Sequence, residues 1–175
     1  KAAEALDECE TVGTGGGECV AATALRGDLM DALEAVVQDE SKSPETIERQ
    51  ATTLATLTRD ASKLTKTSQG TSLQVARTIA KESAVYGLKV AGATARSETA
   101  EGLFSSLSEL LRGDALAASS RTESDRRSDV FSSSIDDLGR ALVKSAVRGQ
   151  APTLLKRDNM GLSASRVAGA VAAVV

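Results

Sequence analysis

The sequence predicts a mainly α protein, an antiparallel helical bundle followed by a few short β-strands. Apolar residues recur at helical spacing through most of residues 22–149. Hydroxyl side chains that can cap helices precede two of these segments. After Gly149 the spacing changes, and Pro152 stands where a helix cannot continue. Because strands follow helices rather than alternate with them, we expect separate layers or subdomains.

The composition indicates a modest hydrophobic core. The 175 residues include two Phe, one Tyr and no Trp, although aromatic rings contribute much of the buried area of ordinary cores. The core must therefore come from Leu, Val, Ile and many Ala, and we expect support from neighbouring domains. The start at Lys1 predicts an excerpt of a longer or processed protein. No apolar run approaches the roughly 20 residues that span a bilayer.

Residues 1–21 are predicted to form a Cys- and Gly-rich lead-in loop, and residues 22–149 the helical subdomain. The first helix is expected from about Ala22 to Gln38. Gly27 weakens it by roughly 1 kcal/mol relative to Ala. The apolar positions at helical spacing are Leu25, Leu29, Leu33, Val36 and Val37.

A strong start signal predicts the second helix. Ser43 can cap the free amides, Pro44 suits the first helical position, and Glu45 favours the positive helix end. Its apolar face is Ile47, Ala51, Leu54 and Leu57. After a polar hinge, Thr67 or Ser68 is expected to cap the third helix. The buried face of that helix is predicted to be Leu73, Val75, Ala76, Ile79, Ser83, Tyr86 and Val90.

Two further helices are predicted. The pattern fades through Gly92–Arg96, returns, and stops near Gly113; its apolar positions are Ala100, Leu103, Phe104, Leu107, Leu110 and Leu111. Residues 117–128 are rich in Ser and charge and are predicted to be a loop. The last helix is expected from Ser128 to Arg148, with Gly149 as its stop. Its inward positions are Val130, Phe131, Ile135, Leu138, Leu142, Val143 and Val147.

Residues 150–175 are predicted to be the first strands of a β-subdomain. Thr153–Arg157 and Leu162–Val167 have the composition of short strands, and Asp158–Gly161 between them is typical of a turn.

The two cysteines flank the Gly-rich run Gly13–Gly17. A disulfide between Cys9 and Cys19 would close this short loop, contribute roughly 2–3 kcal/mol, and imply an oxidising compartment. The alternative is two unrelated reduced thiols. The same run does not match a nucleotide loop, because Glu18 stands where the last Gly of the dinucleotide pattern should be.

The residues that most catalytic devices require are absent. Without histidine, the chain cannot build Ser–His–Asp or Cys–His devices, and two cysteines alone cannot complete a four-ligand zinc site. We therefore expect no enzyme activity, no catalytic residue, no metal and no cofactor. The carboxylates that could pair are interpreted as solvated helix faces: Asp31, Glu34, Asp39, Glu40, Asp136 and Asp137.

The charge pattern argues against nucleic acid as a partner, because the net charge is −3 and the signs are interspersed. Arg121, Arg126 and Arg127 form the one local basic cluster, which we interpret as a solvated loop. Two Arg-Gly-Asp tripeptides, 26–28 and 112–114, spell the signal read by integrin-type receptors. The first lies inside a predicted helix, and chance together with Gly as a helix stop explains both.

The helical segments resemble the receptor-for-egg-jelly and GAIN segment of the polycystin-family ectodomain. The similarity rests on the runs LMDALE (29–34), SPETI (43–47), QATTLATLT (50–58), LT (64–65) and SQ (68–69). Further along, LVK (142–144) and GQAP (149–152) are similar to the family's step from a last helix to its first strands.

The resemblance implies a helical subdomain like GAIN subdomain A, within a large cell-surface receptor, often on cilia or flagella. Such receptors can associate with polycystin channel subunits. GAIN domains often cleave themselves at a His-Leu/Ser-Thr site, which this chain lacks, so cleavage would lie beyond Val175 or be absent. We therefore expect a noncatalytic extracellular scaffold that binds protein partners. The alternative is an intracellular helical-bundle interaction or signalling module.

Overall fold

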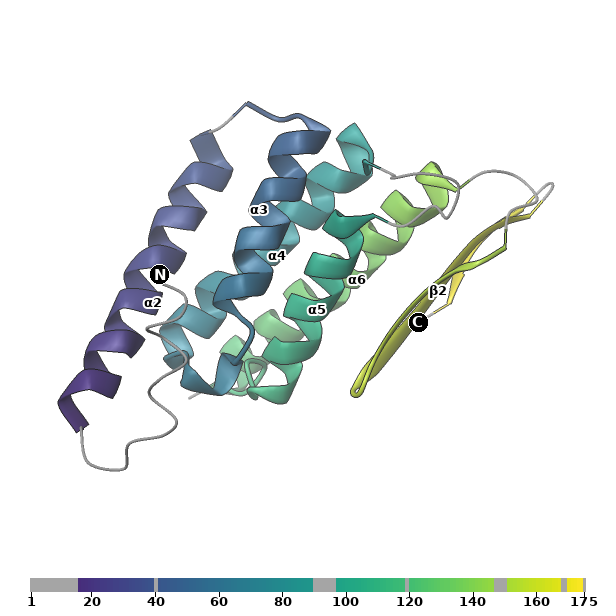
Figure 1. Cartoon of the computed structure of the whole chain (residues 1–175). Coiled ribbons are helices and arrows are strands. Elements are labelled where there is room, and N and C mark those ends of the chain that lie inside the picture. The colour runs from purple at the N-terminus through teal and green to yellow at the C-terminus, as the bar shows by residue number, and fades with distance from the viewer. Residues whose placement is uncertain are drawn as a thin grey trace.

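The computed structural model describes residues 16–39, 41–89, 97–118, 120–146, 151–167 and 170–174. In this part of the chain, five α-helices pack together and antiparallel strands follow them (Figure 1). The mainly α fold class and the order of helices before strands are confirmed. The helices are α2 (Gly16–Asp39), α3 (Pro44–Leu57), α4 (Lys66–Tyr86), α5 (Glu98–Arg112) and α6 (Arg121–Ser145), with a 3-10 turn η2 (Ala61–Lys63) between α3 and α4.

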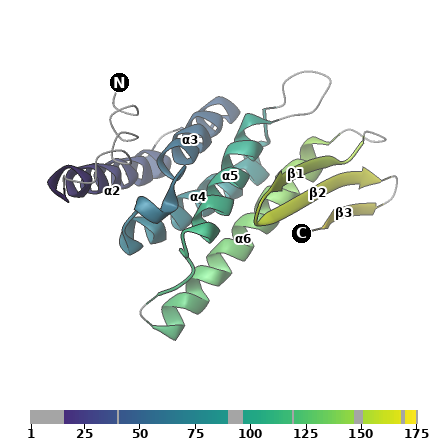
Figure 2. The ribbon, with the colours of Figure 1, turned by 60° about the horizontal axis from the view of Figure 1, so that its bottom comes forward.

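The helices form two layers. Consecutive helices run in opposite directions, so α4 and α6 are parallel to one another (Figure 1). The most extensive contacts join α4 to α6 and α3 to α5. At one edge α2 packs on α4 and α3, and at the opposite edge the sheet contacts α6 and α5 (Figures 1 and 2). Thus α2 and the sheet are the two outermost elements.

The core uses small and aliphatic side chains, as the composition predicts. Every predicted inward residue of α3 is buried, and Phe104 of α5 is the largest of the fully buried side chains. Tyr86 is an exception, because it lies at the end of α4 and is 51% exposed. The predictions for Val90, Val147 and Gly149 lie outside the described residues.

Ser43 caps α3 as predicted, with its hydroxyl accepting a hydrogen bond of 3.2 Å from the Thr46 amide. The cap predicted for α4, Thr67 or Ser68, is wrong by two or three residues. The cap is Thr65, whose hydroxyl accepts from the Ser68 amide at 3.1 Å. All three positions carry hydroxyl residues, so composition alone does not select between them.

Helix α2 differs from the prediction in its start and its buried face. It begins at Gly16, so residues 16–21, predicted to end the lead-in loop, are helical. Met30, Leu33 and Val37 face the bundle, whereas Leu25, Leu29 and Val36 are exposed. Apolar residues occupy two neighbouring stripes of this helix, and both have helical spacing. Periodicity therefore could not show which stripe the single neighbouring layer would cover.

The loop predicted for residues 117–128 is wrong over most of its length. Helix α6 begins at Arg121, seven residues before the predicted start at Ser128, and ends at Ser145. Ser120 is the cap, and its hydroxyl accepts from the Glu123 amide at 3.2 Å. Most charged residues of this stretch lie on the exposed side of a helix rather than in a loop, and Arg127 is an exception.

The strands form one antiparallel sheet in the order β1-β2-β3. They are β1 (Thr153–Arg157), β2 (Met160–Val167) and β3 (Ala170–Val174). Two strands were predicted at these places, although β2 begins two residues earlier; β3 was not singled out. Leu155 pairs with Leu162 across the β1–β2 hairpin. Both side chains are buried, because this face of the sheet packs on the helices.

Candidate functional site

The one predicted pairing of site residues falls outside what can be described. Cys9 lies outside the described residues, and for Cys19 the structure describes the backbone within α2 but not the side chain. The disulfide therefore stays a prediction. Of the Gly-rich run, Gly16 and Gly17 begin α2 and the preceding residues lie outside the described part.

The acidic residues in the described part of the chain do not gather into a metal site. Among the described residues, no group of three or more His, Cys, Asp or Glu side chains could hold a metal ion. Asp31 and Asp136 are exposed, and Asp137 forms an ion pair with Arg140 at 3.2 Å. Within the same residues, no helix has the length and apolar character to cross a membrane.

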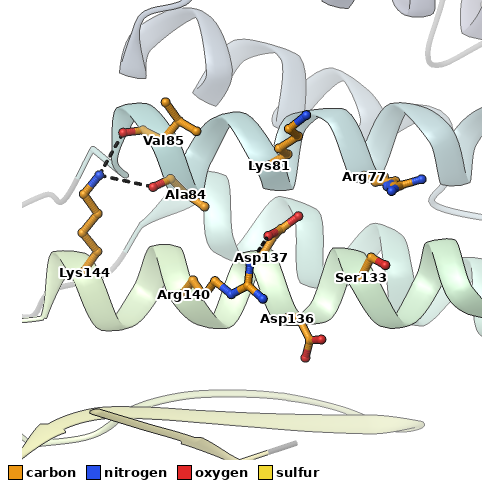
Figure 3. Close-up of a pocket in the computed structure, with 9 residues that line it drawn as sticks. All are labelled: Arg77, Lys81, Ala84, Val85, Ser133, Asp136, Asp137, Arg140 and Lys144. Carbon is orange, nitrogen blue, oxygen red and sulfur yellow. Dashed lines mark hydrogen bonds and ion pairs between the residues drawn. The ribbon is translucent and has the colours of Figure 1, made fainter. Parts of the chain in front are cut away.

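A groove between α4 and α6 is the candidate site (Figure 3). Its volume is about 620 Å³. Residues four apart lie on the same face of a helix, so each of the two parallel helices contributes one row of side chains to the groove. The lining residues are Arg77, Lys81, Ala84 and Val85 from α4, and Ser133, Asp136, Asp137, Arg140 and Lys144 from α6. Sequence reasoning missed this site, because its cations lie on two helices that are distant along the chain.

The groove is positively charged, with four cations and two carboxylates in its lining. Lys144 lies across the end of α4, where its Nζ donates to the carbonyls of Val85 at 2.9 Å and Ala84 at 3.3 Å. A cation at a helix C-terminus is favourable because the last carbonyls lack helical partners. Arg77 and Lys81 are exposed and make no hydrogen bond or ion pair with other described residues. They are therefore available to an acidic ligand.

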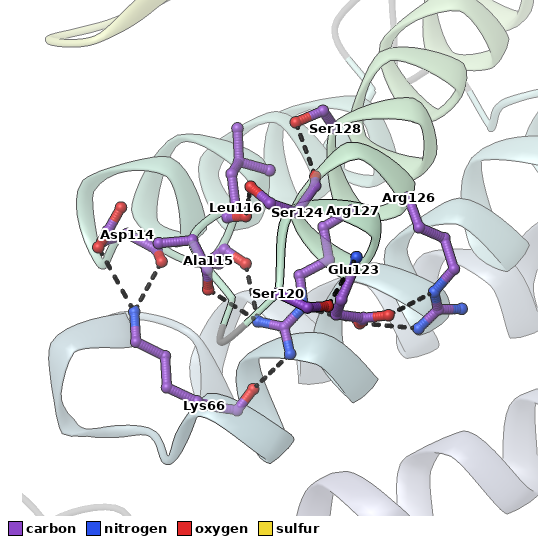
Figure 4. Close-up of polar contacts among 11 residues, drawn as sticks. Lys66, Asp114, Ala115, Leu116, Ser120, Glu123, Ser124, Arg126, Arg127 and Ser128 are labelled. Atoms are coloured by element: carbon purple, nitrogen blue, oxygen red, sulfur yellow. Dashed lines mark hydrogen bonds and ion pairs between the residues drawn. The ribbon is translucent and has the colours of Figure 1, made fainter.

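The predicted basic cluster is a structural joint rather than a solvated loop (Figure 4). The Arg127 guanidinium donates to the carbonyls of Ala115 at 3.0 Å, Ala117 at 3.3 Å and Lys66 at 3.3 Å. It also pairs with Glu123 at 3.0 Å, and its side chain is only 11% exposed. Arg127 thereby holds the α5–α6 connection against the start of α4.

Arg126 completes the joint on its solvent side. Its guanidinium makes two hydrogen bonds to the Glu123 carboxylate, at 2.8 and 3.0 Å. Hydrogen bonds from Arg126 and then Arg127 lower the pKa of Glu123 from 4.5 to about 2. Here the shifted pKa reports a structural ion-pair network, since no reactive group accompanies it.

The two Arg-Gly-Asp tripeptides have structural explanations. Arg26 is buried within α2, so the first is not presented. In the second, a side chain on Gly113 would bring its Cβ to 2.8 Å from the Ala61 Cβ, so close packing requires glycine there. The Gly113 carbonyl also accepts a 3.1 Å hydrogen bond from the buried amide of Gln69.

Comparison of the chain with protein-family models, curated proteins and solved structures found no match. The resemblance to the polycystin-family ectodomain therefore stays a proposal.

Proposed function

We propose that this chain is a noncatalytic extracellular scaffold module of a large, polycystin-like cell-surface protein, one that mediates protein–protein assembly. The observation that carries the proposal is a helical bundle that continues into an antiparallel sheet just after residue 150. That order agrees with the helical subdomain and first strands of a GAIN-like segment. The implied location is the cell surface, and the family resemblance implies cilia or flagella in particular.

Assembly suits the surface of the bundle better than catalysis does. The groove between α4 and α6 offers charged side chains to a partner, but its lining residues include no nucleophile hydrogen-bonded to a base. Protein partners, with a polycystin channel subunit as the first to try, fit the charged groove and the exposed leucines of α2.

The state of the thiols tests the extracellular location. Native material is digested without reduction and mapped by mass spectrometry. A linked pair of Cys9 and Cys19 peptides is the expected result, because a secreted chain meets an oxidising environment. Two free thiols would count against the location. Antibody labelling of intact, non-permeabilised cells that express the parent protein provides an independent measurement.

One observation favours the second candidate, an intracellular helical interaction module. On α2, apolar residues follow one another at spacings of three and four, and the large ones among them are exposed; they are Ala22, Leu25, Leu29, Ala32 and Val36. That is the spacing of coiled-coil seams. Antibody that reaches the chain only after permeabilisation, together with free thiols, would support this candidate over the first.

A further inference from the structure

Helix α2 has an apolar stripe that the bundle does not cover. Leu25, Leu29 and Val36 are 45%, 39% and 47% exposed. Their spacing of four and seven residues places them on one side of the helix. A row of large apolar side chains along an outer helix is unusual, because such residues normally face a partner. The stripe therefore indicates a contact with another surface.

Two acidic residues lie on one side of this stripe, away from the buried face of α2. Asp28 and Asp31 are exposed, and neither forms an ion pair with another described residue. The one basic residue in the sequence of α2, Arg26, is buried. Two α2 helices packed symmetrically would bring carboxylates beside carboxylates, which is unfavourable. The surface that covers the stripe should therefore be basic.

The groove between α4 and α6 has the complementary character (Figure 3). Arg77 and Lys81 are one helical turn apart, which matches the one-turn separation of Asp28 and Asp31. Beside them, Val85 is 58% exposed and offers an apolar contact at the end of the groove. Arg77 and Lys81 can pair with the carboxylates of α2, and Val85 can contact its apolar stripe.

We infer that α2 of one copy of this chain lies along the α4–α6 groove of a second copy. Asp28 and Asp31 meet Arg77 and Lys81, and the apolar stripe covers Val85. The contact is heterologous, because different surfaces of the two copies meet, so it either closes as a reciprocal pair or extends further. The inference rests on the proposed assembly role and specifies its partner.

Charge reversal tests the contact in the full chain. Sedimentation velocity is measured from micromolar to millimolar protein, at low and high salt. One double variant carries Arg77→Glu and Lys81→Glu, and the other carries Asp28→Lys and Asp31→Lys. The wild type should associate, and more weakly at high salt. Each double variant alone should be monomeric, and a mixture of the two should associate again because both contacts become complementary.

A matched control changes the net charge by the same amount at positions outside the groove. Arg59→Glu with Lys156→Glu alters two exposed cations outside the groove and should associate like the wild type. Circular dichroism checks that every variant is folded. If a reversed variant is unfolded, Arg77→Ala with Lys81→Ala replaces it, and weaker association is expected.

Three results would overturn the inference: a monomeric wild type at every concentration, no association in the mixture, or equal weakening by the control pair. Association that survives both reversals but is lost in Leu25→Ser with Leu29→Ser would assign the contact to symmetric α2 pairing instead. These outcomes are separate from the thiol and cell-labelling results, so failure here does not decide the extracellular location.

Discussion

Arg127 shows how one side chain determines the path of a connection. The last carbonyls of a helix and those of the following turn have no helical partners. A guanidinium with five donors in one plane can satisfy several of them. Arg127 reaches two in the turn after α5, on Ala115 and Ala117, and also the carbonyl of Lys66 in the first turn of α4. In the sequence Arg126 and Arg127 are equivalent neighbours. Only burial distinguishes them, because Arg126 is 60% exposed and Arg127 is 11% exposed.

Replacing Arg127 should therefore destabilise the fold more than replacing Arg126. We expect Arg127→Ala to lower the free energy of unfolding by about 1–3 kcal/mol, because it leaves partly buried carbonyls unpaired. Arg126→Ala should have little effect on it, since exposed ion pairs contribute little. Urea unfolding of both variants measures the difference. Equal losses would show that the contacts to the carbonyls contribute nothing.

The pKa of Glu123 predicts a pH-dependent contribution to stability. Its folded-state pKa is about 2, below the ordinary 4.5, so the unfolded chain binds the proton more tightly. The stabilisation is complete above pH 4.5 and is lost as the pH falls toward 2. Glu123→Gln should therefore melt below the wild type at pH 7, and the two should converge near pH 2. Thermal unfolding followed by circular dichroism measures this, and a constant difference would refute it.

At the scale of the element, the sequence predicted a helix start correctly where only one residue could be the cap. Ser43 before Pro44 has a single reading, and its cap is as predicted. The start of α6 was missed, although Ser120 and Glu123 have the three-residue separation of a capping box. The dense charges that follow concealed it, because a helix whose first two turns are solvated shows little apolar periodicity.

At Gly113 the end of α5 approaches η2 closely. Its φ of −76° suits any residue, so the backbone itself would not be strained by a side chain. A Cβ there would, however, lie 2.8 Å from the Cβ of Ala61 and 2.9 Å from its carbonyl carbon. Gly113→Ala should lower the free energy of unfolding by about 1–3 kcal/mol through overpacking.

The control for Gly113→Ala is Gly161→Ala. Its Cβ would have its nearest neighbour, the Leu155 carbonyl oxygen, 4.0 Å away. We expect it to be nearly neutral in the same urea titration. A loss at Gly161 as large as that at Gly113 would mean that the approach of Gly113 to Ala61 is not the cause.

At the scale of the whole molecule, the sheet is packed against the bundle rather than attached by a linker. Leu155 and Leu162 are buried, and β2 lies against α6. The change from helix to strand near residue 150 was predicted from the sequence, because Pro152 and the turn residues from Asp158 onward determine the local backbone. That the sheet would contact α6 and α5 depends on residues distant in sequence.

This packing predicts one cooperative unfolding transition for helices and strands. Leu162→Ala should lower the free energy of unfolding by about 2–5 kcal/mol, because Leu162 is 1% exposed. Leu154→Ala, on a side chain that is 68% exposed, should cost about 0.5 kcal/mol or less. The circular-dichroism signal of the helices should therefore show the same loss of stability in Leu162→Ala. A helical transition that does not change would mean that the sheet unfolds separately.

The amino-acid sequence by itself determined the fold class, most of the helices, the two hairpin strands and the absence of histidine chemistry. These follow from periodicity and from caps that act within a few residues, as at Ser43 and Pro152. The tertiary structure alone decided which stripe of α2 is buried, that Arg127 is a structural joint, and that Arg77 and Arg140 line one groove. Those outcomes depend on which helices become neighbours, and a local pattern that fits two arrangements equally well cannot select one.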